Sequence, residues 1–81
     1  MIFVGVEVKN QVRDSQRAFS QAKANLAFCD KSFLAIPKGQ FDSEDELVRQ
    51  TVCSRAAQNY VGLLLVKRSG VVQEVPAPSQ P

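Results

Sequence analysis

The chain has 81 residues, of which 44% are hydrophobic and 22% charged, and its formal net charge is +2. A chain of this length forms one small domain that buries roughly 60% of its unfolded surface, which leaves a small margin of stability. The sequence contains no histidine, which excludes Ser-His-Asp and Cys-His mechanisms, HNH-type nucleases and most zinc catalysis. Any hydrolytic chemistry must therefore use carboxylates, lysine and a hard metal ion.

Nothing in the sequence is typical of export or of membrane insertion. No apolar run approaches the ~20 residues of a membrane span, and no charged-then-apolar signal segment is present, so we expect a cytoplasmic protein. Cys29 and Cys53 have neither CxxC nor zinc-ligand spacing, and we expect buried reduced thiols, with a disulfide or a metal role as the alternatives. Residues 1–40 carry six Lys and Arg against three Asp and Glu (+3). This excess suits a phosphate backbone or an ordinary solvated surface.

The first half of the chain predicts a strand, a helix and a second strand. Residues 2–8 are almost continuously Val, Ile and Phe, which is typical of a strand covered on both faces. Asp14 is placed to cap a helix that runs to about Phe28. Residues 32–36 predict a short strand that ends at Pro37, and a helical crossover makes the two strands a right-handed parallel pair. The expected inward stripe of the helix consists of Phe19, Ala22, Leu26 and Cys29.

The second half predicts another helix, a strand and a hairpin. Ser43 and Glu46 form a predicted capping box for a helix that runs to about Gln58. Its expected inward residues are Leu47, Val48, Thr51, Val52 and Ala56. Residues 61–66 predict a buried strand, and Ser69-Gly70 turns the chain into a hairpin partner at 71–75. The predicted fold is one α/β domain over residues 1–75, a small open mixed sheet in β-α-β-α-β-β order, followed by a proline-rich tail over 76–81.

The acid and the base at the end of the first strand are the leading candidate site. Side chains alternate across a strand, so Glu7 and Lys9 project from the same face. Ligands of open α/β sheets bind beyond the carboxyl ends of the parallel strands. A carboxylate can hold a hard divalent cation, and a neighbouring ammonium can stabilise charge that develops on a phosphate. The alternative is a strand that emerges into water, with both side chains merely solvated.

A polar stripe on the following helix is the second candidate. Arg13, Arg17 and Gln21 are spaced by four, so on one helix they would share a face. The N-terminal end of this stripe would lie close to the exit of the first strand, where guanidinium and amide groups could grip a phosphodiester. The alternative is a solvent-facing side of the helix. Asp30 is expected to shape the loop that enters the second strand, and Tyr60 to be a core or boundary aromatic.

Taken together, these features resemble the second half of a PD-(D/E)xK nuclease domain, the restriction-endonuclease-like fold. The resemblance covers residues 2 to about 76, and five segments carry it in order, namely 6–10, 21–30, 31–37, 62–66 and 70–72. It implies that Glu7 binds Mg²⁺ or Mn²⁺ together with the Val8 carbonyl, and that Lys9 activates the attacking water on DNA. Gln21 matches the glutamine of a Gln-xxx-Tyr motif, but Asn25 stands where the tyrosine would be.

The family pattern also implies elements ahead of Glu7, namely a helix, two strands and a metal-binding Asp. Three explanations follow: a fragment or mis-started gene product, an open edge that pairs with another copy or with a second polypeptide, and a degenerate relative that binds without cutting. The leading hypothesis is an incomplete or divergent metal-dependent nuclease domain that hydrolyses DNA phosphodiester bonds and has little or no activity alone. The alternative is a non-catalytic interaction module that homodimerises through its open sheet edge, with or without nucleic-acid binding. A third hypothesis is a small α/β domain unrelated to nucleases.

Overall fold

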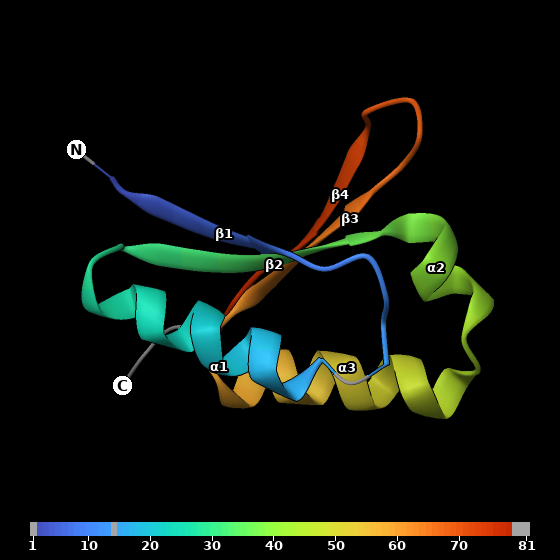
Figure 1. The fold of residues 1–81 in the computed structure, drawn as a ribbon, viewed down its shortest axis with the longest axis horizontal. Helices are drawn as coiled ribbons and strands as arrows, with labels where there is room; N and C mark the ends of the chain where they lie inside the picture. Colours follow the sequence, from blue (N-terminus) through green and yellow to red (C-terminus); the bar gives the residue numbers. More distant parts are fainter. Residues whose placement is uncertain (1, 14, 79–81) are drawn as a thin grey trace.

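The structure is a computed structural model that describes residues 2–13 and 15–78. Strands form one layer and helices a second layer beside it (Figure 1). The elements follow in the order β1 (Val4–Val8), α1 (Gln16–Ala24), the 3₁₀-helix η1 (Asn25–Ala27), β2 (Lys31–Pro37), α2 (Lys38–Ser43), α3 (Glu46–Gln58), β3 (Gly62–Val66) and β4 (Val72–Val75).

The four strands form one open mixed sheet in the order β1-β2-β3-β4. β1, β2 and β3 run parallel, and β4 returns antiparallel to β3. Val6 lies beside Phe33, which lies beside Gly62 on the next strand. The predicted parallel pair and the predicted hairpin are therefore confirmed, and β1 and β4 are the edge strands.

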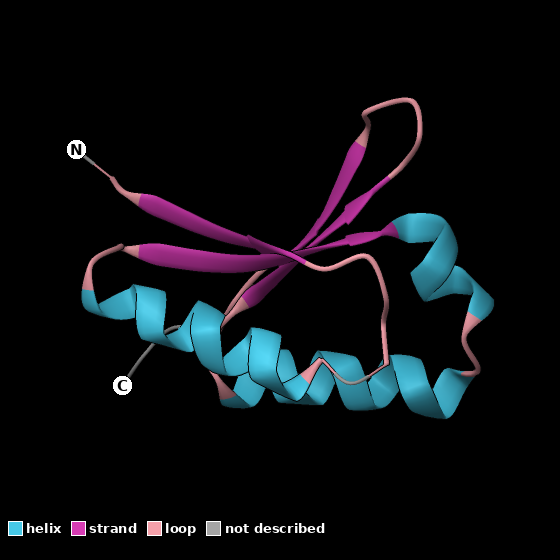
Figure 2. Ribbon diagram, viewed as in Figure 1, coloured by secondary structure: helices cyan, strands magenta, loops and turns pink. Residues whose placement is uncertain are grey.

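The core lies between the sheet and the helices α1 and α3. Both helices cover the same face of the sheet (Figure 2). Right-handed crossovers that advance along a sheet in one direction place their helices on one face, and the strand order here advances in that way from β1 to β3. Each fully buried apolar side chain contributes about 1.5–3 kcal/mol. The largest fully buried side chains of this core are Phe19, Leu34, Ile36, Val61 and Leu63.

The prediction that the first strand is covered on both faces is wrong. Val4, Val6 and Val8 are 52%, 46% and 75% exposed, because they project from the face opposite the helices. On the helix side, a Cβ at Gly5 would lie 3.2 Å from Asn25 Cβ and from Cys29 Sγ. The apolar run at residues 2–8 therefore does not indicate two covered faces. β1 packs against the helices on one face, and no helix of the described residues covers its other face.

The helix boundaries also differ from the prediction. α1 begins at Gln16, and the predicted cap Asp14 lies outside the described residues. The helix tightens into η1 at Asn25, which leaves Leu26 and Cys29 half-buried rather than in the core. Both cysteines are free thiols and both are half-buried.

The start of the third helix shows a different cap from the one predicted. Residues after Pro37 form α2, whose Phe41 is buried. Ser43 is the last residue of this helix, and its hydroxyl donates to the Gln40 carbonyl at 2.8 Å instead of capping α3. Asp45 caps α3 instead, since its carboxylate accepts from the Val48 amide at 2.9 Å. The inward face follows spacing by four through Val48, Val52 and Ala56, which turns Leu47 and Thr51 toward solvent.

Candidate functional site

Glu7 and Lys9 lie at the C-terminal end of β1, on the side of the sheet that the helices cover. The Lys9 amide donates to the Ala35 carbonyl at 3.0 Å, so the ladder between β1 and β2 continues past Val8. Because side chains alternate along a strand, Lys9 remains on the side of Glu7, as a spacing of two predicts. Both residues are half-buried.

The carboxylate of Glu7 is oriented by a neutral amide. Asn25 Nδ2 donates to Glu7 Oε1 at 3.1 Å in a partly buried contact. Asn25 begins η1, so the end of the first crossover helix fixes the direction of the acid on β1. Sequence reasoning gave Asn25 no role, because the contact depends on how η1 packs against β1.

Glu7 and Val8 can supply only part of a metal site. The described residues contain no group of three or more His, Cys, Asp and Glu placed to hold a metal ion. Mg²⁺ prefers about six oxygen ligands in near-octahedral geometry. The remaining ligands would have to come from water, a substrate phosphate or another polypeptide. The residues present therefore fit a divalent cation only in part, at the outer edge of the sheet.

The predicted stripe of Arg13, Arg17 and Gln21 is not a single helix face. Arg13 precedes α1, and its guanidinium binds Glu44, with Nη2 3.2 Å from Oε2. Arg17 and Gln21 do lie on α1, where both are exposed. A stripe with period four requires all three residues on one helix, and the helix begins three residues after Arg13. The Arg13–Glu44 pair bridges residues far apart in the sequence, so spacing alone could not reveal it.

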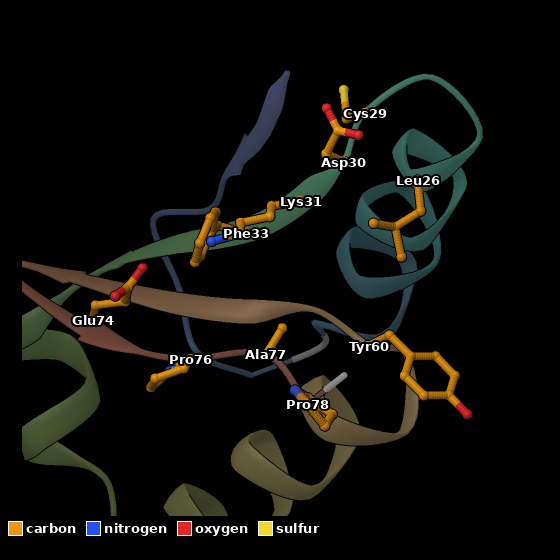
Figure 3. Close-up of a pocket in the computed structure, with 10 residues that line it drawn as sticks. All are labelled: Leu26, Cys29, Asp30, Lys31, Phe33, Tyr60, Glu74, Pro76, Ala77 and Pro78. Carbon is orange, nitrogen blue, oxygen red and sulfur yellow. The ribbon is translucent and has the colours of Figure 1, made fainter. Parts of the chain in front are cut away.

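A cavity of about 580 Å³ lies at the opposite end of the sheet from Glu7 and Lys9 (Figure 3). It borders η1, the start of β2 and the segment after β4, and Tyr60, with a left-handed φ of 57°, lies on its wall. Asp30 shapes the loop beside it, as expected, by accepting a hydrogen bond from the Phe3 amide at 2.8 Å. Lys31 and Glu74 are the other charged residues of the wall. Because the wall carries charges of both signs among apolar and polar residues, it indicates no particular class of ligand.

The surface that sequence reasoning missed is the sheet face opposite the helices, here called the open face. No helix of the described residues covers it (Figure 1). The alternation over residues 4–9, with valines at even positions and Gly, Glu and Lys at odd positions, is the signal that could have shown it, because period-two alternation marks a strand with unlike faces. The apolar residues of the open face are Val4, Val6, Val8, Phe33, Ala35, Leu64, Val66 and Val72, and the strand registers place Lys31 and Glu74 on the same face.

Comparison with known proteins gives no relative. No family model matches the chain, and no curated protein and no solved structure matches it. Within the described residues, no helix is long and apolar enough to cross a membrane.

Proposed function

We propose that this protein is an interaction module that binds a strand of another polypeptide along the outer edge of β1. The observation that supports the proposal is the direction of the β1 backbone groups. The Phe3 carbonyl accepts from the amides of Asp30 and Lys31, and the Lys9 amide donates to Ala35. Backbone groups of successive strand residues point to opposite sides, so the N–H and C=O groups of Val4, Val6 and Val8 point outward.

Apart from the charge of Glu7, whose own backbone groups point toward β2, the outer edge of β1 lacks the features that normally prevent strand addition. Edge strands are usually blunted by charges, prolines, bulges or a covering element. Over Val4–Val8 the edge is regular and contains no proline, and its outward positions are all valine. No strand of the described residues pairs with it. Main-chain hydrogen bonds to such an edge give affinity, and alternate side chains give specificity.

A capped peptide of alternating threonine and valine tests the proposal directly. Backbone amide exchange, measured by NMR, should slow at Val4, Val6 and Val8 when the peptide is added in excess. The change Val6→Pro removes one outward N–H and no bond to β2, so it should weaken peptide binding by about tenfold or more. Unchanged exchange at all three amides would refute strand addition at this edge.

A second candidate function, metal-dependent hydrolysis of DNA, is favoured by the position of the Val8 carbonyl. By strand alternation this carbonyl points to the outer edge of β1, and it directly follows Glu7, whose carboxylate Asn25 orients. In the PD-(D/E)xK resemblance this order of elements would be one half of a restriction-endonuclease-like core, and a bound strand could supply a further acidic ligand. Mg²⁺ or Mn²⁺ held there would stabilise charge on a phosphodiester, and Lys9 would orient or activate the attacking water.

Cleavage of plasmid and linear single-stranded DNA with Mn²⁺ tests this second candidate. Mn²⁺ accepts oxygen ligands of the same kind as Mg²⁺, and the isolated chain is expected to cut little or not at all. Cutting that disappears in Glu7→Gln but persists in the surface control Glu74→Gln would support the nuclease function. Cutting above background that is equal in the unmodified chain and in Glu7→Gln would refute the role of Glu7.

A further inference from the structure

We infer that the strand which binds the outer edge of β1 is β1 of a second copy of this chain, running antiparallel with Val6 opposite Val6. The inference rests on the proposed strand addition and names its partner. β1 is the strand Val-Gly-Val-Glu-Val, with valine at its first, middle and last positions. A two-fold axis through Val6, perpendicular to the sheet, therefore places valine opposite valine along the whole strand.

The hydrogen bonds of this register match the groups that point outward. In antiparallel strands, residues of a hydrogen-bonded pair exchange both N–H···O bonds. The pairs Val4 with Val8, Val6 with Val6 and Val8 with Val4 use every outward N–H and C=O of the strand. Their side chains all lie on the open face, where the valines now exposed would contact one another across the two strands.

Charge and the extent of the strand separate this register from its two symmetric neighbours. With Val6 on the axis, Glu7 lies opposite Gly5 of the second copy, so no like charges oppose each other. A shift that places Glu7 on the axis sets two carboxylates directly opposite, which destabilises an antiparallel pair. A shift that places Gly5 on the axis pairs Val8 with Ile2, which precedes the strand. The Val6-centred register alone pairs β1 completely without a repulsive contact.

The other edge of the sheet is a poor competitor. The Lys67 amide donates to the Val71 carbonyl at 2.9 Å, so in β4 the outward backbone groups belong to Val72 and Glu74. Glu74 would bring charge to that edge, and Pro76 follows as a residue without an N–H. Charge and proline are the features that block edge pairing, so self-association should use β1.

The size of the contact predicts a weak, concentration-dependent dimer. The five residues of β1 extend about 17 Å at about 3.3 Å each. A contact one strand wide over this length buries far less than the ~800 Å² per partner of a stable complex. We therefore expect a dissociation constant on the order of 10⁻⁴ M.

Sedimentation equilibrium of the full chain, with variants at the two edges, tests the inference. Val6→Pro removes an outward N–H from β1 and should weaken dimerisation by about tenfold or more. Val72→Pro is the matched control, since it removes an outward N–H from β4, and it should change the dissociation constant by less than about twofold. Far-UV circular dichroism reports whether each variant keeps its fold.

Disulfide trapping tests the register of the two β1 strands. The native cysteines are first replaced, by Cys29→Ser and Cys53→Ser, so that only the introduced cysteine can cross-link. Opposed Val6 residues have Cα atoms about 5.5 Å apart, within the disulfide range of about 4.4–6.8 Å. Two Val4 residues would lie about 13 Å apart along the strands, too far to bridge. Oxidation should therefore cross-link Val6→Cys and leave Val4→Cys monomeric.

Three results would overturn the inference. All three differ from the unchanged amide exchange with added peptide that would refute strand addition itself. A chain that remains monomeric to about 1 mM would exclude the second copy, and the peptide experiment above would still decide whether the edge binds strands. Dimerisation weakened by Val72→Pro and not by Val6→Pro would place the contact at β4. Cross-linking of Val4→Cys in preference to Val6→Cys would exclude the register centred on Val6.

Discussion

Replacing Gly62 by alanine is expected to destabilise the fold. An added Cβ would lie 2.6 Å from both Cδ1 and Cε1 of Phe33 and 3.0 Å from the carbonyl oxygen of Val75. Phe33 is only 7% exposed, so its ring has little room to turn away, and the Val75 carbonyl is part of the backbone. Overpacking of this kind costs about 1–3 kcal/mol.

Thermal unfolding followed by circular dichroism measures this effect. A loss of 1 kcal/mol lowers the Tm of a 60–100-residue domain by about 4–8 °C, so a loss near the middle of the range lowers it by about 8–16 °C. Gly39→Ala is the matched control, because no atom beyond its chain neighbours and the backbone of its own helix lies within 4 Å of its added Cβ. Gly39 lies within α2, where alanine should add about 0.5–1 kcal/mol.

The two glycine variants must therefore shift in opposite directions. If Gly62→Ala melts within about 2 °C of the unmodified chain, the close approach of Phe33 to β3 does not constrain this position. If Gly39→Ala is the less stable of the two, the packing argument is refuted for both sites.

Three further predictions concern the cap of α3, a buried hydroxyl and the orientation of Glu7. Asp45→Ala should cost about 1 kcal/mol in urea unfolding, whereas Ser43→Ala should cost less than about half of that; equal losses would contradict the assignment of the cap. Ser32 Oγ is buried without a hydrogen-bond partner among the described residues, so Ser32→Ala should leave the unfolding free energy unchanged or raise it by up to about 1 kcal/mol; a loss above this size would reveal a bond. Asn25→Asp sets a second carboxylate beside Glu7. The Tm of this variant should therefore fall further below that of the unmodified chain as pH rises from about 4 to 7, and Mn²⁺ should restore part of the loss. A Tm difference that does not depend on pH would exclude this contact.

The strand pattern could be predicted because it depends on local chemistry. Apolar runs bounded by turn residues identified all four strands, and the spacing of the first two fixed their parallel pairing. Alternation over residues 4–9 could have shown that the two faces of β1 differ, but not which of them the helices cover. Whether Val6 is buried depends on the order of strands in the sheet, which places α1 and α3 on the same side, and that order is a property of the whole chain.

For the candidate site, too, the local arrangement could be predicted and the contacts between distant segments could not. Alternation along a strand was enough to place Glu7 and Lys9 on one face. The contact of Glu7 with Asn25 could not be derived, because it depends on the point at which α1 tightens into η1. Arg13 was assigned to a helix that begins three residues later, and its partner Glu44 belongs to a distant loop. Contacts between distant segments follow from packing rather than from spacing.

The open face should also leave a mark on the heat capacity of unfolding. A chain of 81 residues is expected to show an increase of about 1.0–1.2 kcal/mol/K, mainly from apolar surface newly exposed to water. In this fold Val4, Val6, Val8 and Val72 are hydrated before unfolding, so they add little to that change. The calorimetric increment should lie below the usual range, and the curve of stability against temperature should be correspondingly flat.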